Sequence, residues 1–180
     1  MAITMRAGYD FAIVVLDRPV KGVGEPAPLY AGAEEMNRLR AIAGHGMRGA
    51  GSPGERADDY DDENPRAAAQ NLIENVTEAV DPILAGEDGG NGLGLDFDKE
   101  AGGVQNTEGA LTPVNEREGA LASDDSGGSR WMRYRKQWRV IGVNANGDTS
   151  QYGAVAYFAR VSGQAEWIKS AFPGAKLTGG

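Results

Sequence analysis

The chain of 180 residues contains no cysteine and a single histidine, His45. The absence of cysteine excludes disulfide bonds, thiolate nucleophiles and cysteine-ligated zinc or iron–sulfur centres. His45 has no second histidine and no positioned serine with which to form a metal site or a catalytic triad. We therefore expect His45 to be an exposed loop residue and the protein not to be an enzyme.

The sequence also lacks a long apolar segment. Its N-terminal run, MAITMRAGYDFAIVVL, is interrupted by Asp10 and followed by Asp17. This run is far shorter than the roughly 20 apolar residues that cross a bilayer. It has no small-residue cleavage site of the kind that a secretory signal peptide carries. We therefore expect no membrane association and no secretion through a recognisable signal peptide.

Aromatic residues make up only 7% of the chain, whereas glycine (27) and proline (8) are abundant. This composition predicts a modest core that does not use the whole chain. The formal net charge of −8 argues against a general affinity for nucleic acid or anionic membranes. Acidic residues are concentrated in Glu87–Asp125, which has ten of them against two basic residues.

Two kinds of pattern occupy the first half of the chain. Asp10–Leu16 is a β-branched run closed by Pro19, which is typical of a well-buried strand. A short helix that ends at Gly44 is predicted next. Its apolar residues recur at helical spacing: Met36, Leu39, Ile42 and Ala43.

A longer amphipathic helix is predicted over 64–85, with Asn64 as its N-cap and Pro65 at its first position. Its apolar stripe consists of Leu72, Val76, Val80 and Ile83. Near the C-terminus, strand-like runs flank Asn146-Gly147, a pair that favours a type I′ hairpin turn. A last short helix is predicted around Trp167 and Ile168.

These elements predict an α+β fold: a small antiparallel β-ribbon or sheet, two or three short helices, and long irregular acidic, glycine-rich segments. The predicted organisation has five parts. They are an N-terminal strand and short helix (1–43), a flexible acidic loop (44–63), an amphipathic helix (64–85), an extended acidic, glycine-rich segment (86–129) and a C-terminal hairpin with a helix (130–180).

The stretch RWMRYRKQWR, Arg130–Arg139, gathers basic and aromatic side chains in an otherwise acidic chain. The candidates for contact with a partner or with nucleic acid are Arg130, Trp131, Arg133, Tyr134, Arg135, Lys136, Trp138 and Arg139. Proteins that bind single strands combine a positive groove with aromatic stacking platforms. In the alternative interpretation the tryptophans are core anchors, and the cations flank a strand or contact the chain's own acidic segments.

Motif matches elsewhere predict no cofactor and no dedicated metal site. GHGMRG, Gly44–Gly49, matches a dinucleotide-binding pattern but follows a predicted helix instead of a strand. The acidic run Asp58–Glu63 is expected to favour the positive end of the helix that follows it. Gly89–Asp98 and the residues after it fit neither the calcium-binding nonapeptide nor an EF-hand loop, which leaves only weak surface binding of Ca²⁺ open there.

The resulting hypothesis is a non-enzymatic structural or adaptor subunit of a larger protein assembly. It would dock through small folded blocks and extended segments onto other protein subunits, including further copies of itself. A capsid-associated, neck or tail protein of a virion suits this pattern, which gives a cytoplasmic or virion-associated location. The alternative is a nucleic-acid-binding accessory protein that uses Arg130–Arg139.

Overall fold

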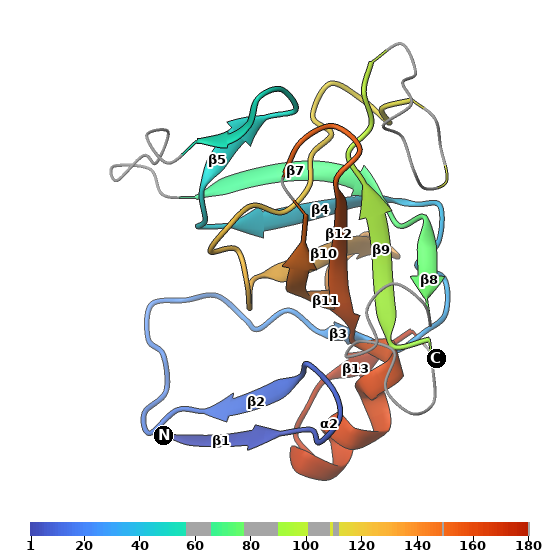
Figure 1. Cartoon of the computed structure of the whole chain (residues 1–180). Coiled ribbons are helices and arrows are strands. Elements are labelled where there is room, and N and C mark those ends of the chain that lie inside the picture. The colour runs from blue at the N-terminus through green and yellow to red at the C-terminus, as the bar shows by residue number, and fades with distance from the viewer. Residues whose placement is uncertain (57–65, 78–89, 101–108, 110–111, 149, 180) are drawn as a thin grey trace.

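The computed structural model describes residues 1–56, 66–77, 90–100, 109, 112–148 and 150–179. Within these ranges the protein is mostly antiparallel β-sheet with one short helix (Figure 1). The strands are β1 (Ala2–Met5), β2 (Ala12–Val15), β3 (Leu29–Tyr30), β4 (Leu39–Gly44), β5 (Arg48–Ala50), β6 (Gly54–Arg56), β7 (Ala67–Leu72), β8 (Asn75–Thr77), β9 (Gly92–Asp96), β10 (Ser129–Tyr134), β11 (Gln137–Gly147), β12 (Val155–Arg160) and β13 (Leu177–Thr178). The helical segment is η1 (Ser162–Gln164) continued by α2 (Ala165–Ala171).

The main sheet has the strand order β7-β4-β10-β11-β12-β9-β8, and every pairing along this path is antiparallel. Strands β7 and β8 stand at its two ends, yet only Ile73 and Glu74 separate them in the chain. The sheet therefore curls so that its two ends are held by one continuous stretch of backbone, as Figure 1 shows at β7 and β8. Strand β3 adds to β11 in parallel and pairs with β13.

The core lies inside this curl. Its buried side chains come from most strands of the sheet and from the loops beside it: Tyr30, Ile42, Ile73, Leu93, Leu95, Leu121, Met132, Ile141, Ala156 and Phe158. All five residues of β9 are buried, and this strand belongs to the segment predicted to be extended and irregular. In the sequence GLGLD of this strand, Leu93 and Leu95 are fully buried and fill the core.

The α+β prediction is wrong, because two of its helices are strands. Residues expected in the first helix form β4, which pairs with β10 on one side and β7 on the other. Residues expected at the centre of the second helix form β7 and β8, while Val80 and Ile83 lie outside the described residues. Strand pairing along both edges of β4 satisfies the hydrogen-bonding groups of its backbone. This stabilisation outweighs the weak helical preference that the spacing of the apolar residues indicated.

The C-terminal elements agree with the sequence in part. The helix predicted around Trp167 is confirmed, with Ile168 buried. Strands β11 and β12 form the expected antiparallel pair, but Asn146 and Gly147 are paired inside β11, and the connection to β12 is longer. The tight turn instead joins β10 to β11 at Arg135-Lys136, where both residues have positive φ (47° and 67°).

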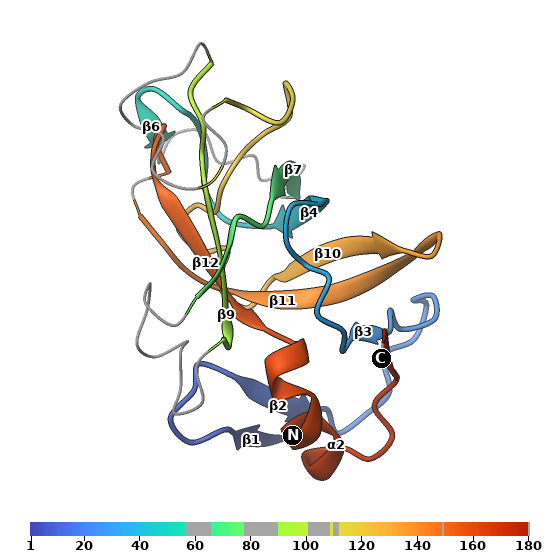
Figure 2. The same cartoon turned by 90° about the vertical axis from the view of Figure 1, so that its right-hand side faces the viewer.

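The N-terminal strands β1 and β2 form a separate two-stranded ribbon. Figures 1 and 2 both place this ribbon beside α2, away from the main sheet. The ring of Phe11 packs edge-on against Trp167 with centroids 5.9 Å apart, and Arg6 donates to the side chain of Gln164. The strand predicted over Asp10–Leu16 is therefore present, but it is largely exposed and not buried.

Two further findings concern loops and membranes. The predicted loop 44–63 contains a small ribbon of β5 and β6, and the rest of it from residue 57 lies outside the described residues. His45 is exposed, as predicted.

Among the described residues, no helix has the length and apolar character needed to span a membrane.

Candidate functional site

The basic-aromatic stretch forms the hairpin β10–β11, and the two faces of this hairpin separate its side chains. Arg130 and Met132 on β10 are buried in the core, and Arg139 on β11 is only 8% exposed. Tyr134 packs against Tyr30 with ring centroids 5.1 Å apart. Three of the eight candidate residues therefore serve the interior of the curled sheet.

Arg130 has few partners for a buried cation. Its Nη2 donates to the carbonyl oxygen of Asn71 at 3.0 Å, and its guanidinium lies 5.0 Å from the centre of the Phe158 ring. Its Nε and Nη1 have no hydrogen-bond partner among the described residues. Burial, with a smaller contribution from the nearby Arg40, holds the pKa of Arg130 well below its usual value. A ligand on the surface of the hairpin cannot reach this guanidinium.

The outer face and the tip of the hairpin carry the accessible candidates. Arg133 stands directly opposite Trp138 in the register, so both side chains share one face of the ribbon. Trp138 is 51% exposed, and Trp131 on the same strand as Arg133 is half-buried. Arg135 and Lys136 are exposed at the turn. The hairpin thus presents three cations and an exposed indole at one projecting end.

A second surface feature is the arm, which we define as residues 1–23. The described part of the chain has twelve exposed large apolar side chains, and eight of them lie on the arm. They are Met1, Ile3, Met5, Val14, Val15, Leu16, Val20 and Val23. Isolated exposed apolar residues are common on proteins, but Ile3 and Val14 lie directly opposite each other in the ribbon and so share one face. Exposed apolar residues grouped on one face indicate an interaction surface. The arm is therefore the largest concentration of exposed apolar residues in the part of the chain that the structure describes.

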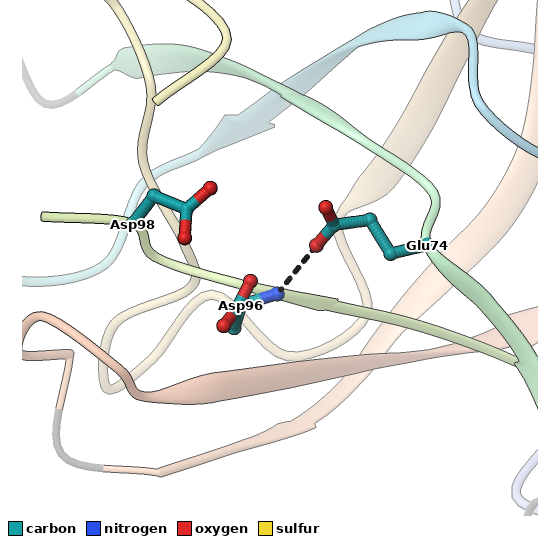
Figure 3. A group of neighbouring side chains, drawn as sticks. All are labelled: Glu74, Asp96 and Asp98. Carbon is teal, nitrogen blue, oxygen red and sulfur yellow. Dashed lines mark hydrogen bonds between the residues drawn. The ribbon is translucent and has the colours of Figure 1, made fainter. Parts of the chain in front are cut away.

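A third feature is the carboxylate cluster, which we define as Glu74, Asp96 and Asp98. Glu74 lies in the link between β7 and β8, Asp96 ends β9, and Asp98 follows two residues later. One carboxylate oxygen from each residue lies within 4.8 Å of the others. Figure 3 shows the three carboxyl groups facing a common space. Glu74 also accepts a hydrogen bond from the backbone N–H of Asp96 at 3.4 Å.

The cluster lies in an electrostatically unfavourable environment. Asp98 is only 3% exposed, and its Oδ1 has no hydrogen-bond partner among the described residues. Burial, followed by the charges of Asp96 and Glu118, raises the pKa of Asp98 to about 7. Glu118 is fixed beside the cluster because its carboxylate accepts the backbone N–H groups of Asp98 (2.7 Å) and Val114. Burial also raises the pKa of Glu118.

A cleft of about 380 Å³ opens near Glu118, lined mainly by alanine, glycine and other small residues. Its polar lining includes Arg48, Arg117, Asp125 and Ser150. The hydroxyl of Ser150 donates to the carbonyl oxygen of Leu121 at 2.6 Å. Two carboxylate residues, Glu118 and Asp125, also line the cleft.

No protein-family model matches the chain, and no curated protein is significantly similar to it in sequence. The features above are therefore interpreted from their own geometry. Sequence reasoning examined Gly89–Asp98 only for calcium-binding loop motifs, and so it missed the cluster. The alternation Asp96-x-Asp98 was the available signal, because residues two apart on a strand share a face. No sequence pattern indicates Glu74, because only the curl of the sheet brings it close to Asp96 and Asp98.

Proposed function

We propose that the protein is a non-enzymatic structural subunit of a larger protein assembly, and that the arm is the element by which it joins its neighbours. The observation that carries this proposal is the concentration of exposed apolar side chains on residues 1–23. Among the described strands, β1 and β2 pair only with each other, so both outer edges of the ribbon are open. Open edges accept further strands, and exposed apolar faces bury against partners.

Charge favours a second copy of this chain as the partner of the arm. Residues 1–23 contain three basic and two acidic side chains, whereas the remaining residues contain 15 basic and 24 acidic ones. The arm is therefore slightly positive and the rest of the molecule strongly negative. Complementary charge of this kind steers the arm of one chain toward the negative part of another chain. The negative parts of two chains repel each other. We propose a virion, with the protein as a capsid-associated, neck or tail subunit, as the setting for such self-association.

The test is the association state of the 180-residue chain at increasing concentration, measured by sedimentation velocity. Ile3 and Val14 are directly opposite each other in the ribbon, so the double variant I3D/V14D places charge at the centre of one face. We expect the unchanged chain to associate at about 100 μM and the double variant to remain a monomer. Leu39→Asp, at an exposed apolar residue of β4, is the matched control and should associate normally. A monomeric unchanged chain, or equal association of I3D/V14D, would contradict the proposal.

A second candidate function is the binding of single-stranded nucleic acid by the tip of the hairpin. It is favoured by the exposed Trp138 beside Arg133, with Arg135 and Lys136 at the turn. The test is a fluorescence-anisotropy titration with labelled single-stranded DNA and RNA at several salt concentrations. Binding through this surface predicts weaker affinity for Trp138→Ala and a smaller salt dependence for Arg133→Ala. An absence of binding at low salt would exclude it.

A further inference from the structure

We propose that the carboxylate cluster of Glu74, Asp96 and Asp98 binds a divalent cation, and that the cation is Ca²⁺. The three residues come from two places in the sheet, the link between β7 and β8 and the end of β9. A bound ion would connect these two places directly. It would therefore stabilise the contact between the end of β9 and the link from β7 to β8, where the two ends of the curled sheet are joined.

The kind and number of ligands fit Ca²⁺ better than Mg²⁺. Three carboxylate groups each offer an oxygen, and these oxygens lie within 4.8 Å of one another. Ca²⁺ accepts several carboxylate oxygens at about 2.3–2.6 Å in flexible geometry. Mg²⁺ requires about 2.0–2.1 Å and near-octahedral geometry, and it usually keeps several waters and binds one or two carboxylates. The ligand set consists only of oxygen, which suits hard cations and disfavours zinc or copper.

Asp98 supplies the observation that points to a ligand. Its side chain is nearly fully buried, and its Oδ1 has no hydrogen-bond partner among the described residues. A buried carboxylate oxygen without a partner is costly, and buried charges are ordinarily paired or coordinate a metal. Figure 3 shows the Asp98 carboxyl group directed toward the space that it shares with Asp96 and Glu74. A cation in that space would supply the partner that the described residues do not give to Asp98 Oδ1.

Glu118 strengthens the site without entering it. Its carboxylate is held by the N–H groups of Asp98 and Val114, which fixes the backbone of Asp98. Its charge adds to the negative potential at Asp98. Partners that orient a ligand residue in this way are a regular feature of metal sites. The competing arrangement is a proton shared within the cluster, and the experiment below distinguishes the two.

The experiment uses the 180-residue chain, treated with EDTA and then dialysed free of chelator. CaCl₂, MgCl₂ and KCl at matched ionic strength are titrated while heat release and the thermal unfolding midpoint are measured. We expect saturable binding of Ca²⁺ with a Kd of about 10⁻⁴ M, and an increase in Tm of about 4 °C at tenfold excess over that Kd. MgCl₂ should produce less than half of this increase, and KCl none.

Asp98→Asn keeps the shape of the side chain and removes one charged ligand. We expect at least about a tenfold loss of Ca²⁺ affinity, and a Tm in EDTA no lower than that of the unchanged chain. The second condition shows that the variant is folded. Glu100→Gln, two residues further at an exposed position, is the matched control and should bind Ca²⁺ normally. Absent binding, an equal response to Mg²⁺, or unchanged affinity in Asp98→Asn would overturn the proposal and leave the shared proton as the explanation.

Discussion

At the scale of single residues, the unusual feature of this core is that it contains arginines. Arg40 and Arg130 are inward-facing and buried, on adjacent strands of the main sheet. Burial lowers the pKa of Arg40 to about 10, with the charge of Arg38 acting in the same direction. Most hydrogen bonds of Arg40 go to backbone carbonyls, including that of Glu35 at 2.8 Å. These guanidinium groups therefore fill the core and donate hydrogen bonds to backbone carbonyl oxygens. Their removal from water costs solvation free energy.

This cost leads to a prediction for Arg130→Met. Methionine retains most of the volume against Phe158 and removes a buried charge whose Nε and Nη1 have no partner among the described residues. Replacing a poorly paired buried ion by an apolar residue is often stabilising. We expect the free energy of unfolding in urea to rise by about 1 kcal/mol. Arg133→Met, at an exposed position of the same strand, should change it by less than about 0.5 kcal/mol. A loss above about 1 kcal/mol in Arg130→Met would reveal an anionic partner of Arg130.

A second residue-scale prediction concerns Glu35, which is fully buried. Arg160 donates to both of its carboxylate oxygens at 2.9 Å, and the hydroxyl of Ser162 donates at 2.7 Å. These bonds tie the loop before β4 to the end of β12 and to the start of η1. We expect Glu35→Gln to lower the free energy of unfolding by about 3 kcal/mol, because the partly buried guanidinium of Arg160 loses its counter-charge.

The matched control for Glu35 is its neighbour Glu34. Glu34 pairs with Arg38 at 2.6 Å, but both side chains are about half exposed. Surface pairs contribute little, so Glu34→Gln should change the free energy of unfolding by less than about 1 kcal/mol. Equal effects of the two substitutions in urea denaturation would show that the buried pair has no special role.

At the scale of elements, the turn between β10 and β11 is the clearest departure from local preference. Arg135 and Lys136 both adopt positive φ, a conformation for which Asn-Gly is the preferred pair in two-residue hairpins. The double substitution R135N/K136G should raise the free energy of unfolding by about 1 kcal/mol, since it relieves this backbone strain. Urea denaturation measures the gain, and a decrease would mean that the two side chains stabilise the hairpin by contacts. The same variant should weaken nucleic-acid binding if the hairpin tip is the contact surface.

Element types were predicted well mainly in the C-terminal part of the chain. The helix around Trp167 and strands β11 and β12 were expected from runs of apolar residues. In β4 and β10, however, Arg40 and Arg130 occupy inward positions while Trp131 lies on the outer face. Buried arginines and an outward tryptophan invert the alternation by which a strand is recognised. In β7 the alanine-rich AAAQNL favours a helix by propensity, and its strand state depends on pairing with β4.

At the scale of the whole molecule, the sheet order could not be predicted from the sequence. Strand β9 comes from the acidic, glycine-rich segment, yet it lies between β12 and β8 with every residue buried. Its partner β12 is distant in the chain, and β8 was expected to be part of a helix, so no local pattern indicates either pairing. The curl that joins β7 to β8 is also what brings Glu74 to Asp96 and Asp98. The carboxylate cluster is thus a product of the fold, which is why its ligands do not form a loop motif.

Packing is divided unequally between the main sheet and the arm. Amide hydrogens of β9 should exchange slowly, since the strand is buried and paired on both edges. Amide hydrogens of β1 and β2 should exchange quickly in dilute solution, because their ribbon is exposed and contacts the body mainly beside α2. Raising the protein concentration should slow exchange in β1 and β2 while leaving β9 unchanged. Hydrogen exchange followed by mass spectrometry at two protein concentrations measures the exchange rates of β9, β1 and β2 and their dependence on concentration.

Each outcome of that experiment bears on a separate claim. Rapid exchange across β9 would contradict its position between β12 and β8, paired on both edges. Slow exchange in β1 and β2 at every concentration would mean that the ribbon is held by the body of its own chain, and the arm would then be unsuited to join subunits. Rapid exchange there at every concentration would leave the ribbon without a partner among copies of this chain. The proposal requires that amide exchange in the arm slows as the protein concentration rises, while exchange in the main sheet does not change. This result would show that the main sheet folds within one chain and that the arm binds a neighbouring chain.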